Sequence, residues 1–128
     1  MVLDASALVA IALEETGYGT LTEKAGRAAT VVIGAPTAVE AAIVVSSRAG
    51  RDARPMIASL LRSMDAEIVE FNQNHHEAAV MAFLRYGKGR HPAALNFGDC
   101  MCYALASLSG LPVLCTGDDF ARTDIQCA

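Results

Sequence analysis

Hydrophobic residues along the chain form short apolar runs that alternate with longer stretches of helical spacing. The short runs predict strands at residues 1–4, 30–36 and 111–116, the last of them buried, and the alternation of apolar and polar residues predicts another strand at residues 66–71. Apolar residues three and four positions apart predict amphipathic helices at residues 6–15, 36–50, 51–64, 72–87 and 99–110. Pro36 is a favoured first residue of a helix, and Gly50 and Gly87 are typical stops.

The remaining segments are connections. Residues 88–98 predict a loop that contains a proline, and residues 117–123 predict a turn before a last short strand at 124–126. Strands that alternate with helices favour parallel pairing through right-handed crossovers. We therefore expect an α/β fold, a parallel sheet of four or five strands flanked by helices on both faces. No linker divides the 128 residues, so we expect one domain, residues 1–128.

The composition is that of a globular protein, with 53% hydrophobic and 19% charged residues. The N-terminal apolar stretch has no basic region before it and contains Asp4, which argues against a signal peptide. No apolar run reaches the roughly 18 residues of a membrane span. We expect a soluble, cytoplasmic protein without membrane association. Its four cysteines are spaced too unevenly for a disulfide framework or a zinc site.

The net charge of −4 argues against a protein that holds nucleic acid by bulk charge alone. The basic residues are nevertheless clustered. One group contains Arg48, Arg51 and Arg54, and a second, around Gly87 and Gly89, contains Arg85, Lys88, Arg90 and His91. Either group is able to hold phosphates, although a solvated charged loop explains the second group equally well.

Four acidic residues map to one end of the predicted sheet. Asp4 ends the first strand, Glu40 lies early in the helix that Pro36 opens, Asp99 opens a later helix, and Asp118 follows the last long strand. Each has a simpler explanation when taken alone, as a helix cap, an exposed helix residue or a turn residue. Together they lie where parallel α/β sheets bind ligands, beyond the carboxyl ends of the strands.

Four converging carboxylates repel one another unless a cation compensates their charge. Oxygen ligands without His or Cys favour Mg²⁺ or Mn²⁺. Ser6 and Thr116 add hydroxyl groups close to Asp4 and Asp118, where they can orient a carboxylate or a metal-bound water. This arrangement suits phosphodiester hydrolysis with one metal ion or two.

At this point the chain resembles PIN-domain ribonucleases, and among them the VapC-type toxins of prokaryotic toxin–antitoxin pairs. The resemblance runs nearly end to end and rests on "MVLDASALVAIALEE", "APTAVEAAIVV", "YGKGRHPAALNFGDCMCYALA" and "LPVLCTGDDFARTDI". It implies that Asp4, Glu40, Asp99 and Asp118 are the catalytic, metal-binding quartet, with Ser6, Thr116 and Asn96 beside them. Counting from Thr116 favours Asp118 as the fourth acid, whereas counting back from Phe120 favours Asp119.

The resemblance also implies a homodimer, dependence on Mg²⁺ with Mn²⁺ as a substitute, and cleavage of structured RNA such as tRNA or rRNA. It further implies a VapB-type antitoxin that inserts into the active site. The basic group around Gly87 and Gly89 then becomes a candidate contact for RNA phosphate or for the antitoxin.

Two other classes of enzyme or signalling protein fit less well, and one non-catalytic class stays open. A phospho-acceptor domain is also a small parallel α/β protein that binds Mg²⁺, but the chain has only Lys24 and Lys88, and neither lies where such a domain needs a late lysine. An aspartyl phosphatase needs a second Asp two residues after Asp4, where the chain has Ser6. A non-catalytic interaction module is the third alternative, because fold alone does not establish catalysis.

Overall fold

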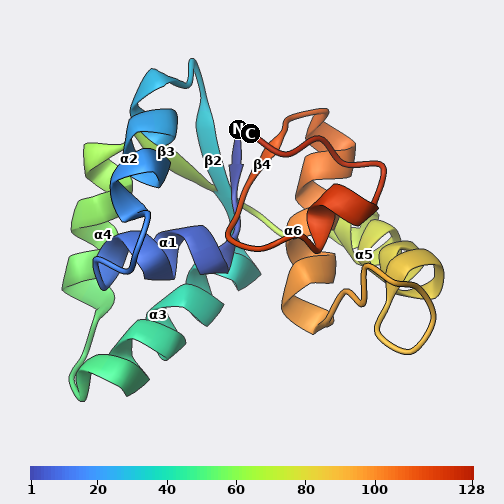
Figure 1. Ribbon diagram of the computed structural model, residues 1–128, viewed down its shortest axis with the longest axis horizontal. Helices are drawn as coiled ribbons and strands as arrows, with labels where there is room; N and C mark the ends of the chain where they lie inside the picture. Colours follow the sequence, from blue (N-terminus) through green and yellow to red (C-terminus); the bar gives the residue numbers. More distant parts are fainter.

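A computed structural model describes residues 1–128 and shows a parallel sheet between two groups of helices (Figure 1). The strands are β1 (Val2–Leu3), β2 (Val31–Gly34), β3 (Ala66–Val69) and β4 (Val113–Leu114). The helices are α1 (Ala5–Ala12), α2 (Tyr18–Arg27), α3 (Ala35–Ala49), α4 (Arg54–Ser63), α5 (Gln73–Tyr86), α6 (Phe97–Ser109) and a short 3₁₀ helix, η1 (Phe120–Arg122). The sheet order is β3-β2-β1-β4 with every pair parallel, so the predicted fold class is confirmed.

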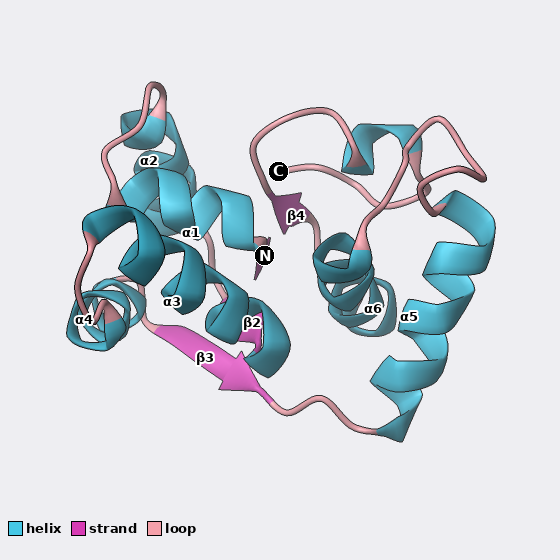
Figure 2. Ribbon diagram, turned by 90° about the horizontal axis from the view of Figure 1, so that it is seen from below, coloured by secondary structure: helices cyan, strands magenta, loops and turns pink.

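The sheet separates two hydrophobic cores. Figure 2 shows α1 to α4 on one side of the sheet and α5 with α6 on the other. Side chains alternate between the two cores along β1 and β4, as the pleat requires. Val2 and Val113 face the α5–α6 core, whereas Leu3 and Leu114 face the core of α1, α3 and α4. Burial on both faces explains why these strands read as unbroken apolar runs.

Two segments differ from the sequence-based expectation. Helix α2 was not predicted, because its apolar residues are few and it contains Gly19 and Gly26, which are poor helix formers. No strand forms at residues 124–126, so this prediction is wrong: the Gln126 carbonyl accepts from the Val113 N–H at 2.9 Å, and the adjacent Cys127 makes an isolated bridge with Val113. The chain is extended there for too short a distance to form a fifth strand.

All four cysteines are free, and Cys100 and Cys102 are buried in the core. No helix combines the length and the apolar character needed to span a bilayer.

Parallel pairing brings the carboxyl ends of the strands to one edge of the sheet. Asp4 directly follows β1, α3 begins directly after β2, and Thr116 lies two residues beyond β4. The first turns of α1 and α3 therefore start at the same edge.

Candidate active site

Asp4 is held between β1 and α1 by hydrogen bonds from Ser6. It is the N-cap of α1, and its Oδ2 atom accepts from the Ser6 backbone N–H at 2.9 Å and from the Ser6 hydroxyl. The Ser6 Oγ atom in turn accepts from the backbone N–H of Thr116 at 3.0 Å. Only 4% of Asp4 is exposed. Ser6 thus ties the Asp4 carboxylate to the loop after β4.

Asp99 lies in the first turn of α6 and forms a capping box with Asn96. The Asp99 Oδ2 atom accepts from the Asn96 N–H at 2.8 Å, and the Asn96 Oδ1 atom accepts from the Asp99 N–H at 2.9 Å. Burial is the main cause that raises the pKa of Asp99 from 3.8 to about 6; the Asn96 hydrogen bond opposes this rise, and the charges of Asp4 and Asp119 support it. Asp99 is therefore both a structural cap and an acid with uncompensated charge.

Glu40 approaches Asp99 across a glycine. A Cβ atom placed on Gly98 would overlap the carboxylate of Glu40, so only glycine leaves room for that group at the start of α6. Burial raises the pKa of Glu40, and the nearby charges of Asp4 and Asp99 add to the effect. Gly98 is a site residue that sequence reasoning missed. The available signal was a glycine inside the first turn of a helix, where it lowers helix propensity.

The structure brings Asp119, rather than Asp118, to these carboxylates. Asp119 lines the same cavity as Asp4, Glu40 and Asp99, and Asp118 does not. Gly117 turns the chain at φ +81°, and Phe120, 2% exposed, anchors the following 3₁₀ helix in the core. Because the buried anchor fixes the register, counting back from Phe120 selects the residue that faces the cavity.

The cavity has a volume of about 350 Å³ and an unbalanced charge. Besides the four acids, Ser6, Asn96 and Thr116 line it, so every predicted site residue except Asp118 is present. Its only cationic lining residue is Arg48, whose Nη1 atom lies 2.6 Å from the Oε1 atom of Glu15. The lining thus contains five carboxylates and one guanidinium.

The donor chemistry of this cavity fits a hard divalent cation. The carboxylate and hydroxyl oxygens are ligands that Mg²⁺ and Mn²⁺ prefer. No group of three or more acidic, His or Cys side chains is close enough to hold an ion by itself. Mg²⁺ does not need such a cage, because it usually keeps several waters and binds one or two carboxylates together with substrate phosphate.

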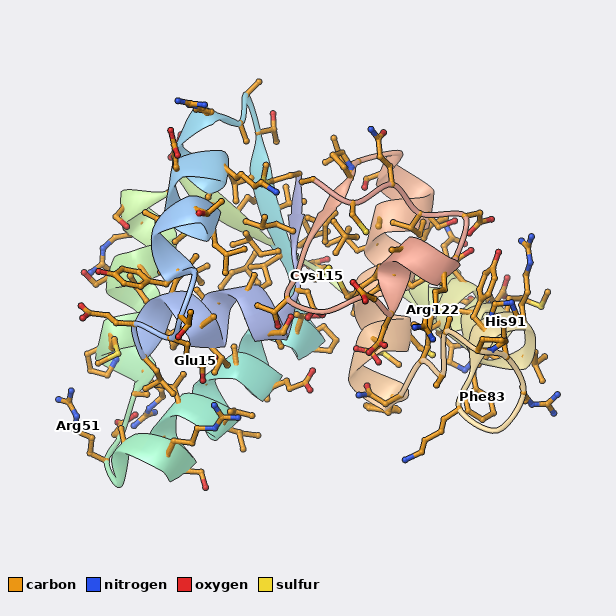
Figure 3. The ribbon with its side chains drawn as sticks, viewed as in Figure 1. Glu15, Arg51, Phe83, His91, Cys115 and Arg122 are labelled. Carbon is orange, nitrogen blue, oxygen red and sulfur yellow. The ribbon has the colours of Figure 1, made fainter.

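The basic loop around Gly87 and Gly89 does not line the cavity. Figure 3 shows its His91 beside Arg122, on the α5 side of the molecule, well away from Glu15. Arg85 pairs with Asp124 at 3.1 Å, and the Arg90 guanidinium lies 5.7 Å from the centre of the Phe83 ring. This loop is a separate exposed surface.

Comparisons with known proteins show the family of this chain. The model of the PIN domain family matches residues 1–126. The chain is 44% identical over 127 residues to ribonuclease VapC36 of Mycobacterium tuberculosis, covering 98% of this chain and 91% of that protein. It is 38% identical over 125 residues to a ribonuclease VapC of Mycolicibacterium smegmatis, covering 98% and 97%.

Two solved structures share the fold. Mycobacterium tuberculosis VapC20, described as a sarcin-ricin loop cleaving toxin, superposes with a TM-score of 0.79 at 17% identity, over 97% of this chain and 95% of that one. A toxin–antitoxin complex from Klebsiella pneumoniae gives a TM-score of 0.71 at 18% identity, over 96% and 92%.

Proposed function

This chain belongs to the PIN-domain family and, within it, to the VapC ribonucleases, and we propose that it is a metal-dependent endoribonuclease whose active site is the acidic cavity. The main support is the convergence of four carboxylates in that cavity: Asp4, Glu40, Asp99 and Asp119. They come from the ends of β1 and β4 and from the early turns of α3 and α6. A binding module that cleaves nothing has no chemical reason to bring four acids together at this edge.

The four carboxylates are the groups that would hold Mg²⁺ or Mn²⁺. When bound, such an ion orients and acidifies a water and stabilises charge on the leaving oxygen. Asp4 and Asp99 are the most firmly positioned, because Ser6 fixes one oxygen of Asp4 and Asn96 fixes one oxygen of Asp99. In each case these hydrogen bonds are accepted by the Oδ2 atom. Ser6 and Asn96 thus act as positioning residues.

The substrate we infer is structured RNA such as tRNA or rRNA. A structural neighbour is described as a toxin that cleaves the sarcin-ricin loop, and the curated relatives are ribonucleases. A second neighbour is a toxin–antitoxin complex, which supports inhibition of this chain by a VapB-type antitoxin. We place the protein in the cytoplasm, where RNA and free thiols are found together, and assign residues 1–128 to a single PIN domain.

We also propose a homodimer that buries an apolar surface beside the cavity. This surface contains Val39 and Ile43 of α3, which are 58% and 63% exposed, and Phe97 of α6, which is 80% exposed. The three side chains line one groove together with Met101. Large apolar side chains exposed next to one another mark association surfaces. A second copy of this chain is the occupant that the proposal requires.

The experiment that tests the nuclease assignment is cleavage of a mixed pool of tRNA and rRNA by antitoxin-free protein. Reactions contain Mg²⁺, Mn²⁺ or EDTA, and wild type is compared with Asp99→Asn. We expect cleavage that requires metal and is lost in the variant. Cleavage that survives the substitution would indicate a contaminating nuclease, and no cleavage by wild type would favour the interaction-module alternative.

A further inference from the structure

The single cation of the acidic cavity lies at the opposite end from the four acids. Glu40, Val44 and Arg48 follow one another at intervals of four residues along α3 and all line the cavity. Eight residues of helix place Arg48 roughly 12 Å along the axis from Glu40. The cavity lining therefore extends along α3 from Glu40, near the other site acids, to Arg48, which pairs with Glu15.

Arg48 is neutralised by a residue from the neighbouring helix connection. Glu15 lies just beyond the end of α1, and α1 packs against α3. Figure 3 shows Glu15 between these two helices. The 2.6 Å contact joins the Arg48 Nη1 and Glu15 Oε1 atoms, and the two side chains are 56% and 43% exposed. The ion pair forms one end wall of the cavity.

An ion pair this exposed contributes little to stability, typically below about 1 kcal/mol in water. It can therefore exchange its partner at small cost. A phosphate is a stronger partner for Arg48 than a solvated carboxylate, because the guanidinium fork matches two phosphate oxygens. Phosphates along one strand of B-form DNA rise about 3.4 Å per nucleotide. On that scale, an RNA strand whose scissile phosphate meets the acids reaches Arg48 within a few nucleotides.

We propose that Arg48 binds a flanking phosphate of the RNA strand and that Glu15 occupies Arg48 until RNA displaces it. The inference rests on the proposed nuclease function and adds a positioning residue to it. Arg48 would set the direction in which the strand leaves the four carboxylates. Glu15 would act as a competitor that weakens RNA binding and holds the guanidinium in place when no RNA is present.

The test uses apparent kcat and KM for metal-dependent cleavage of the tRNA and rRNA pool. The variants are Arg48→Gln, Glu15→Gln, the double variant, and Arg51→Gln as the matched control. Arg51 is exposed, does not line the cavity and points outward beyond the end of α3 (Figure 3). Melting temperatures verify that each variant folds.

Arg48→Gln should raise KM about tenfold and change kcat by less than about twofold, because one charge-assisted contact made in the bound state is lost. It should also lower the slope of log KM against log salt concentration by about 1, which corresponds to the loss of one phosphate contact. Glu15→Gln should lower KM about twofold, because the competing carboxylate is gone. In the Arg48→Gln background, Glu15→Gln should have no further effect.

Two results would overturn the assignment of Arg48 while leaving the nuclease intact. One is that the double variant has the KM of wild type and that Arg51→Gln raises KM as much as Arg48→Gln does. This result would mean that only the overall charge of the protein matters. The other is a loss of activity in the same direction for Glu15→Gln and Arg48→Gln, which would mean that the pair is merely structural. Metal-independent cleavage or no cleavage by wild type would instead overturn the nuclease proposal, and the role of Arg48 with it.

Discussion

The two sides of helix α3 differ in chemistry: one lines the acidic cavity and the other is an exposed apolar surface. On one side, Glu40 and Arg48 line a cavity with five carboxylates, and the pKa of Glu40 is raised by burial and by neighbouring acids. On the other side, Val39 and Ile43 are exposed and line apolar grooves. The two surfaces meet at the first turn of α6, where Gly98 contacts Glu40 and Phe97 is exposed to solvent.

The comparison shows that the function of the acidic side depends on the positions of single atoms, whereas that of the apolar side depends on the area it can bury. Removing the Ser6 hydroxyl or adding one methyl group at Gly98 would change how a carboxylate is held. Hydrophobic burial is non-directional and scales with the area covered, so the apolar side tolerates many substitutions that keep its size and polarity. Substitutions that move or remove a carboxylate should therefore affect the acidic side most, and substitutions that introduce a charge should affect the apolar side most.

The largest expected effect distinguishes two adjacent acids. Asp119→Asn should lower kcat/KM about 100-fold or more, because it removes one of the charges that converge in the cavity. Asp118→Asn is the matched control, since both residues are exposed and differ by one position in the chain. It should stay within about twofold of wild type, because Asp118 is outside the cavity. The opposite order of effects would restore Asp118 as the fourth acid.

Gly98→Ala should separate activity from stability. The new Cβ atom would overlap the Glu40 carboxylate, and the flexible Glu40 side chain can move away at low cost to the fold. Alanine is also the better helix former. We expect an unchanged or higher melting temperature with a loss of kcat of about tenfold or more.

Gly26→Ala is the control for this substitution. Gly26 lies in helix α2, and a Cβ atom added there would meet nothing within 4 Å, so the variant should gain helix stability and keep full activity. Equal activity of Gly98→Ala and Gly26→Ala would show that the position of the Glu40 carboxylate does not matter.

Much of this arrangement was predictable from the sequence, because the predicted strands determine where the acids after them lie. Runs such as residues 111–116 are apolar enough to indicate buried parallel strands, and parallel strands end at one edge. Asp4, Glu40 and Asp99 therefore fall together without any three-dimensional information. Their hydrogen-bonding partners were also within reach, since Ser6 and Asn96 lie two and three residues away.

The features that the sequence did not reveal depend on contacts between distant segments. The choice between Asp118 and Asp119 depends on the burial of Phe120 and the turn at Gly117, which no local pattern measures. The pair of Glu15 and Arg48 joins residues 33 positions apart. Gly98 lowers the helix propensity of the first turn of α6, and only the structure shows why glycine is there: the Glu40 carboxylate lies against it.

On the apolar side of α3, a charge should break association. Ile43→Asp introduces a carboxylate at a residue that is 63% exposed, so the folded chain should retain its stability while the proposed dimer loses affinity by roughly 30-fold. Light scattering coupled to size-exclusion chromatography measures the mass over a range of concentrations. Ile43→Val is the control that keeps the surface apolar. A dimer that survives Ile43→Asp would place the interface elsewhere.

The smallest effect is the pH dependence of the metal-free protein. The pKa of Asp99 is about 6 in the folded chain against an ordinary value of 3.8, so its contribution to stability is complete below about pH 4 and is lost as pH rises through 6. The raised pKa of Glu40 acts in the same direction. In EDTA, the melting temperature of wild type should fall by about 2–4 °C between pH 5 and pH 7 relative to Asp99→Asn, which keeps an oxygen for the capping box. Saturating Mg²⁺ should remove that difference by compensating the charge. Identical pH profiles in EDTA would show that burial and neighbouring charges do not destabilise the ionised Asp99 carboxylate.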